Sequence, residues 1–268
     1  MSVRKPAVAG RFYPGRKDEL LAELERCLTA TADPESALGV VVPHAGYVFS
    51  GATAGAVYSR VKIPDRVAVL SPNHTGMGAP VSVWSEGVWL TPMGEVEIDA
   101  ALAAALLKGC PEAEADEAAH AREHSLEVQL PFLQKLNPNA RILPVTLGTH
   151  RVSTLESLGR ALASAITDAG GDVLIVASSD MTHFESAGSA RRRDEMALEK
   201  LRAMDPAGLM AVVQRERISM CGAAAAAVML WAAGELGAAE CELVDYTHSG
   251  MVTGDESEVV AYAGLICR

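Results

Sequence analysis

Three of the seven histidines in this chain each follow a short apolar run that is typical of a buried β-strand. They are His44 after residues 39–42, His74 after residues 67–70, and His183 after residues 173–176. In an open α/β sheet, ligands bind in the crevice beyond the carboxyl ends of the strands. Imidazoles delivered by three separate strands would therefore converge. The pattern predicts a mononuclear metal site or an acid–base cluster at that edge.

The loops that carry His44 and His74 are built from small or turn-forming residues. Pro43 biases the residue before it toward an extended backbone, and Gly46 lets a ligand approach the loop closely. His74 has a similar setting, with Pro72 before it and Gly76 after it. A single histidine in such a loop could equally be an ordinary strand-end residue, but two similar ones favour a functional role.

His183 has a carboxylate three residues earlier, in the segment Ser178-Ser179-Asp180-Met181-Thr182-His183. A carboxylate beside an imidazole fixes its tautomer and raises its basicity, which serves a metal ligand or a general base. We therefore expect Asp180 to orient His183. The alternative is that Asp180 only caps a turn.

Cys221 precedes an alanine-rich segment that has the composition of a helix. A helix N-terminus lowers the pKa of a thiol, so Cys221 could be a thiolate ligand or a nucleophile. A lone cysteine in this position is more often a small buried hydrophobe, and the residues around it favour that interpretation.

Two further residues could line the same site from the side. His124 stands at a helix entrance with Glu127 one turn on, and the alternative is a capping arrangement made by Glu123 and Ser125. Phe12 lies in an irregular segment, where it could wall a pocket or anchor the N-terminal segment to the core.

Composition excludes several classes of function. The net charge of -11 argues against nucleic-acid binding, which needs clustered basic residues. Neither a glycine-rich phosphate loop nor a GxSxG or HExxH motif is present. We find no apolar run that approaches the roughly 20 residues needed to span a bilayer, and no signal peptide, so a cytoplasmic protein without a membrane role is expected. The five cysteines are odd in number and widely spaced, which suits a reducing compartment better than disulfides.

Strands alternate with helices along the chain, and no linker divides it. This predicts a single α/β domain over residues 1–268, with a central mixed β-sheet flanked by helices. The predicted strands are 39–42, 66–70, 141–147, 172–177, 241–246 and 258–266, with a β-hairpin formed by 81–84 and 88–90. The predicted helices are 17–30, 50–60, 99–107, 125–136, 154–169, 190–204, 206–214 and 222–236.

Six short motifs occur here in the order in which they occur in Memo family proteins, known in prokaryotes as AmmeMemoRadiSam system protein B. They are the segments 7–14 (AVAGRFYP), 43–47 (PHAGY), 72–74 (PNH), 123–127 (EHSLE), 178–183 (SSDMTH) and 221–222 (CG). Because the motifs run from the first ten residues toward the last strands, the chain is identified as a member of that family.

The resemblance implies a fold similar to the class III extradiol ring-cleavage dioxygenases, which hold Fe(II) with two histidines and a glutamate. By this resemblance His44 and His74 match the metal histidines and His183 the acid–base histidine, while Cys221 stands in the place of the glutamate. A thiolate is a softer ligand, so copper is the alternative to Fe(II), and ring cleavage becomes doubtful. The resemblance also implies a peptide ligand for animal members, and association with an AMMECR-type protein and a radical SAM protein for prokaryotic ones.

Three hypotheses remain open from the sequence. The first is a metal-dependent redox enzyme with metal ligands His44, His74 and Cys221, and with His183, Asp180 and His124 as catalytic candidates. The second is a non-catalytic binding or scaffold protein whose pocket holds a peptide or partner. The third is a metal-free hydrolase in which Cys221 is the nucleophile and His183 the base.

Overall fold

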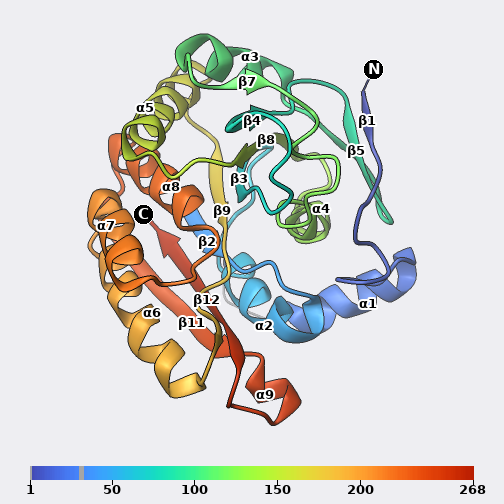
Figure 1. Cartoon of the computed structure of the whole chain (residues 1–268). Coiled ribbons are helices and arrows are strands. Elements are labelled where there is room, and N and C mark those ends of the chain that lie inside the picture. The colour runs from blue at the N-terminus through green and yellow to red at the C-terminus, as the bar shows by residue number, and fades with distance from the viewer. Residues whose placement is uncertain (1, 30–32) are drawn as a thin grey trace.

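A computed structural model describes residues 2–29 and 33–268 as one α/β domain built around a large mixed sheet (Figure 1). Within the described residues this sheet has nine strands, in the order β10-β12-β2-β9-β3-β8-β4-β7, with β11 also paired to β12. The strands are β2 (Gly39–Val42), β3 (Arg66–Pro72), β4 (Val81–Val83), β7 (Glu114–Ala115), β8 (Arg141–Leu147), β9 (Leu174–Ser178), β10 (His183–Glu185), β11 (Cys241–His248) and β12 (Val259–Cys267). The predicted fold class is thus confirmed.

Helices cover both faces of this sheet, as Figure 1 shows. The helices are α1 (Lys17–Cys27), α2 (Tyr47–Tyr58), α3 (Ala100–Gly109), η1 (Glu127–Gln129), α4 (Leu130–Leu136), α5 (Val152–Asp168), α6 (Ala187–Arg202), α7 (Pro206–Glu216), α8 (Ala223–Glu235) and α9 (Gly250–Thr253). Every predicted helix has a counterpart, although the predicted end of the first one, Ala30, lies outside the described residues. The predicted helix 125–136 begins as the 3-10 turn η1, and α2 starts three residues early.

Alternation along the strands divides the core into two halves. Val41 and Leu70 pack with α3, α5 and α8 on one face, whereas Val42 and Val69 pack with α1, α2 and α4 on the other. Successive side chains of a strand point to opposite faces, so these continuous apolar runs fit strands that are buried on both sides. The alanine-rich helix α8 is almost entirely buried, and it lies in the core.

Four neighbouring strands of the sheet are parallel. β2 pairs with β9, β9 with β3, and β3 with β8, all in parallel register. The carboxyl ends of β2, β3 and β9 therefore lie at the same edge of the sheet. The loops that follow them carry the residues singled out by the sequence pattern.

The predicted β-hairpin is wrong. β4 pairs with β7 and β8 in the large sheet. The second predicted strand, β5 (Val88–Thr91), belongs to a separate three-stranded sheet with β1 (Val3–Arg4) and β6 (Gly94–Glu97). The turn signal between the two segments is real, but it redirects the chain from one sheet to the other. Strand pairing was decided by tertiary packing rather than by local turn chemistry.

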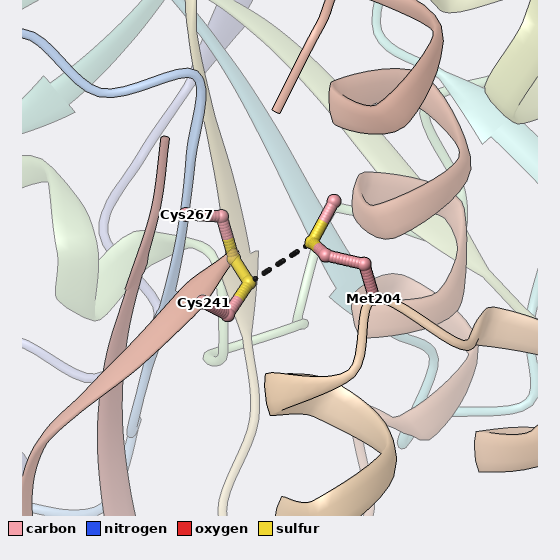
Figure 2. Close-up of a disulfide and its surroundings, with 3 residues drawn as sticks. All are labelled: Met204, Cys241 and Cys267. Atoms are coloured by element: carbon pink, nitrogen blue, oxygen red, sulfur yellow. Dashed lines mark hydrogen bonds between the residues drawn. A yellow bond between two sulfur atoms is a disulfide. The ribbon is translucent and has the colours of Figure 1, made fainter. Parts of the chain in front are cut away.

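A disulfide joins Cys241 and Cys267, which corrects the expectation of an entirely reduced chain (Figure 2). The two residues face each other in the antiparallel pair β11–β12. Figure 2 also shows the Sδ atom of Met204, which lies 3.3 Å from the Sγ atom of Cys241. A separation of 26 residues conceals this proximity in the sequence, because only strand register brings the two cysteines together.

Candidate metal centre

His44, His74 and Cys221 converge at the carboxyl edge of the parallel strands. One potential ligand atom from each lies within 4.8 Å of the other two. The Sγ atom of Cys221 lies 3.2 Å from Nε2 of His44. Two donors bound to one ion at roughly 2.0 to 2.3 Å, about 90° apart, would lie about 3 Å from each other. The spacing of this pair therefore suits a shared metal ion.

The tautomer of His44 follows from its hydrogen bonds. Its Nδ1 lies 2.9 Å from the hydroxyl of Ser178. That hydroxyl gives its only proton to the carbonyl oxygen of Ser125, at 2.6 Å, and also accepts from the side-chain amide of Gln129. Nδ1 of His44 must then donate, which leaves the lone pair of Nε2 facing Cys221. Burial, together with the nearby histidines, lowers the pKa of His44.

His74 is fixed by a buried carboxylate. Glu123 accepts a hydrogen bond from Nδ1 of His74 at 2.8 Å and another from its backbone N–H at 2.7 Å. Burial disfavours the charged form of His74, but the hydrogen bond and charge of Glu123 outweigh burial and raise its pKa. In the same way burial opposes the ionisation of Glu123, yet its contacts with His74 and Ser125 hold its pKa below the usual range. This arrangement presents Nε2 of His74 to the site.

Glu123 contacts a candidate ligand, which the sequence analysis does not predict. The sequence pattern predicts Glu123 only as half of a capping arrangement with Ser125, and the structure does show both Ser125 donors bound to Glu123. The same carboxylate nevertheless reaches His74, 49 positions away in the chain. Its place next to His124 is the one local signal that could have drawn attention to it.

Cys221 lies just before α8, as predicted, but its environment differs from the expectation. Burial, followed by the charge of Asp180, raises the pKa of the Cys221 thiol despite hydrogen bonds from nearby backbone N–H groups. The expected lowering by the helix N-terminus is therefore wrong for the metal-free thiol. A bound metal ion reverses this balance, because a coordinating thiol is deprotonated outright.

Asp180 does not orient His183, contrary to the prediction. The carboxylate of Asp180 accepts a hydrogen bond from the backbone N–H of His44 at 2.7 Å. His183 instead places its Nδ1 3.0 Å from the carbonyl oxygen of Ser219, and its backbone N–H donates to the Ser219 hydroxyl. Asp180 thus fixes the loop of one proposed ligand, while the segment before Cys221 holds His183. Burial raises the pKa of Asp180.

His124 and Phe12 form one wall of the site. The His124 ring stacks on His74 with 4.7 Å between the ring centroids, and the centroid of Phe12 lies 4.8 Å from that of His124. Burial lowers the pKa of His124 in spite of the opposing charge of Glu123. The structure therefore brings both predicted side residues to the site.

Several of these residues, but not Cys221, line a cavity of about 490 Å³. His44, His74, His124, His183 and Asp180 form its polar side. Phe12, Phe49, Val260 and Tyr262 supply apolar walls. Cavities of this size, with a few convergent polar groups on apolar walls, are typical of small-molecule sites.

Comparison with known proteins assigns the chain to a family. A family model described as Memo-like protein matches residues 4–266. The chain belongs to the Memo-like protein family. Among its relatives, a MEMO1 family protein from Aquifex aeolicus is 44% identical and one from Methanopyrus kandleri is 40% identical, each match covering 99% of both chains.

The fold of this Memo-like chain also occurs outside close sequence relationship. The crystal structure of an uncharacterized protein from Escherichia coli K12 superposes with a TM-score of 0.56 at 16% sequence identity. The match covers 85% of this chain and 98% of the other. At that level of identity the likeness concerns the fold alone.

In the described residues, no helix is long and apolar enough to cross a membrane.

The donor set of the Memo-like chain fits a transition metal. Two imidazoles and a thiolate suit iron, copper or zinc, whereas magnesium and calcium prefer oxygen ligands. A second group of potential metal ligands, formed by His74, Glu123 and His124, shares His74 with the first group. Glu123 is only 1% exposed and already accepts four hydrogen bonds, from His74 and Ser125. It is thus better suited to support a ligand than to be one.

Proposed function

We propose that this Memo-like chain binds one iron or copper ion through His44, His74 and Cys221 and uses it in a metal-dependent redox reaction. The observation that carries the proposal is the shared orientation of the two histidines. Ser178 contacts Nδ1 of His44, and Glu123 contacts Nδ1 of His74. Both Nε2 atoms are therefore left to coordinate a metal ion in the region of the Cys221 sulfur. Bound there, iron or copper would supply Lewis-acid and one-electron redox chemistry.

His183 is the proposed acid–base residue. A carbonyl oxygen can only accept a hydrogen bond, so the Ser219 contact requires Nδ1 of His183 to carry the proton. Nε2 is then an acceptor on a residue that lines the cavity. It can take a proton from a ligand held between the apolar walls, as a general base does. A small organic molecule with an ionisable hydroxyl is the ligand class that this arrangement fits.

A second candidate is a binding or scaffold function without turnover. It is favoured by apolar side chains beside cavity residues: Phe184, next to His183, is 74% exposed, and Met251, close to Ser249 and Thr253, is 70% exposed. Such residues suit contact with a peptide or a protein, including the AMMECR-type and radical SAM partners that the family resemblance implies. The hydrolase hypothesis receives no such support, because Cys221 contacts His44 rather than His183.

Elemental analysis of anaerobically purified protein tests the metal proposal. We expect close to one iron or copper ion per chain in the wild type and a large loss in Cys221→Ser. Cys110→Ala is the matched control, since Cys110 is a buried free cysteine that belongs to neither group of potential ligands. Wild-type protein that lacks metal and takes up neither Fe(II) nor copper on reconstitution overturns the proposal.

His183→Ala separates the two candidate functions. The substitution should leave metal content unchanged and remove any turnover, since His183 is assigned to proton transfer and not to the ligand set. Metal content and oxygen consumption with phenolic substrates are the measurements. Loss of metal in this variant would make His183 a ligand. Unchanged turnover would remove it from the mechanism.

A further inference from the structure

A groove of about 690 Å³, separate from the cavity that His44 and His74 line, runs along the N-terminal segment. It is lined by residues 3–8 and by Glu117, Ala121 and Arg122 from the segment 117–122. Trp84, from the loop after β4, also lines it. We call this cavity the N-terminal groove. Its volume falls in the range of small-ligand sites.

Three cationic side chains line the N-terminal groove: Lys5, Arg11 and Arg122. All three are exposed, and among residues 2–29 and 33–268 none has a side-chain hydrogen bond or ion pair. Many other basic side chains of this chain, including Arg60 and Arg66, contact a carboxylate. A concentration of unpaired cations stands out in a protein whose net charge is -11.

The charges of the groove add up to a small positive excess. The single acidic residue on its lining is Glu117, whose carboxylate accepts a hydrogen bond from the Ser2 hydroxyl. Arg4 also lines the groove, but its guanidinium is buried against Glu127 at 2.8 Å and is neutralised there. Three free cations and one carboxylate leave an excess of two positive charges on the lining.

Buried hydrogen bonds hold the walls of the groove in place. Glu127 accepts hydrogen bonds from Arg4 and from the backbone N–H groups of Ala7 and Val8. Arg4 in turn donates to the carbonyl oxygens of His120 and Glu123, which ties the segment 117–122 to the N-terminal strand. The buried pair thus fixes the spacing between the two sides, so a ligand would not have to order them on binding.

We propose that the N-terminal groove binds a small organic dianion, with its charged groups held by Lys5, Arg11 and Arg122 and its carbon skeleton against Pro6, Val8 and Trp84. Guanidinium groups present paired N–H donors that match phosphate and carboxylate oxygens. The net positive charge selects two negative charges over one. A phosphate monoester and a dicarboxylate share this chemistry.

The groove adjoins the metal centre but does not depend on it. Arg11 directly precedes Phe12, and Arg122 is two residues before His124, so the same two segments supply the groove and the wall of the metal cavity. None of the three cations belongs to the proposed ligand set. A failure of metal binding would therefore leave this proposal untouched, and the reverse also holds.

Calorimetric titration tests the proposal. The full chain, treated with a chelator so that no anion can bind a metal, is titrated at low ionic strength with glycerol 3-phosphate, with malate, and with lactate as a monoanion. Arg11→Gln and Arg122→Gln are the groove variants. Arg192→Gln is the matched control, because Arg192 is exposed, has no side-chain partner among the described residues, and lies on α6 away from the groove.

We expect at least one dianion to bind more tightly than lactate, and each groove variant to weaken it about tenfold, which corresponds to the loss of one charge-assisted hydrogen bond. The control should bind as the wild type does, and added salt should weaken binding. Preference for glycerol 3-phosphate identifies a phosphate ester, and preference for malate a dicarboxylate. Absence of binding at millimolar concentration, equal affinity for lactate, or an equal loss in Arg192→Gln overturns the proposal.

Discussion

Two clusters of titratable side chains lie close together in this protein, and they differ in how their polar atoms are used. The first is the N-terminal anchor, which we define as Arg4, Tyr13, His120 and Glu127. Both ring nitrogens of its histidine have protein partners: Nδ1 contacts the Thr146 hydroxyl at 3.0 Å and Nε2 the Ser82 carbonyl oxygen at 3.2 Å. The anchor is satisfied by the protein itself, as buried polar groups usually are.

The candidate metal centre is the second cluster, and in its two proposed histidine ligands one ring nitrogen is left to face other potential ligands. His44 and His74 use Nδ1 for protein contacts, while Nε2 of His44 faces two other potential ligands, the Cys221 sulfur at 3.2 Å and the Asp180 carboxylate at 4.0 Å. The comparison indicates that burial and a shifted pKa do not by themselves identify a candidate metal ligand. The feature that distinguishes His44 and His74 from His120 is a ring nitrogen that faces other potential ligands.

The largest expected effect comes from removing a ligand. His44→Ala should reduce bound metal from near one ion per chain to a small residue, because two remaining donors hold an ion far more weakly. His120→Ala, a change of the same type in the anchor, should leave metal content intact. Elemental analysis of both folded variants makes the comparison. Equal metal content in wild type and His44→Ala would remove the distinction between the clusters.

Breaking the anchor should instead affect stability. Glu127→Gln leaves Arg4 as a buried charge without its partner, and such changes cost about 3–5 kcal/mol of unfolding free energy. Glu156→Gln breaks an exposed ion pair with Arg160 and should cost under about 1 kcal/mol. Urea unfolding of both variants measures the difference. Similar losses in the two variants would mean that the buried pair Arg4–Glu127 contributes no more to stability than an exposed ion pair does.

The pH dependence of stability gives a third test. Burial, followed by the charge of Arg4, lowers the pKa of His120 from 6.5 to about 4. Between pH 6.5 and about 4, the unfolded chain binds a proton at this histidine that the folded chain does not bind. The free energy of unfolding therefore falls as the pH drops through this range. The contribution is about 3 kcal/mol at most. His120→Gln should flatten this part of the profile, and exposed His150→Gln should not. An identical slope in both variants would contradict the assignment.

A smaller effect is expected from Glu123, which accepts a hydrogen bond from the proposed ligand His74 and is not itself in the proposed ligand set. Glu123→Gln should weaken metal affinity about 10–100-fold, as losses of such supporting carboxylates do. Glu117→Gln, an exposed change in the same segment, should leave affinity unchanged. Competition with a chromophoric chelator measures both. Complete loss of metal from a folded Glu123→Gln protein would place Glu123 in the ligand set.

Much of the fold could be predicted from local patterns. The apolar runs before His44 and His74 specify strands buried on both faces, and the helical spacing of Leu20, Leu24 and their neighbours specifies α1. Parallel strands place their carboxyl ends at one edge, so the convergence of His44 and His74 followed from the strand assignment. For Cys221 the local sequence favoured a buried hydrophobe over a thiolate ligand, and the family resemblance placed it in the ligand set.

The chain's own residues determined which segments become strands and helices and which side chains stand at strand ends, because those properties depend on near neighbours in the sequence. Only the tertiary structure decided that Glu123 supports His74, that Ser219 rather than Asp180 holds His183, and that Cys241 pairs with Cys267. These contacts join residues 26 to 49 positions apart. Their existence depends on strand register and loop packing, which no local pattern encodes.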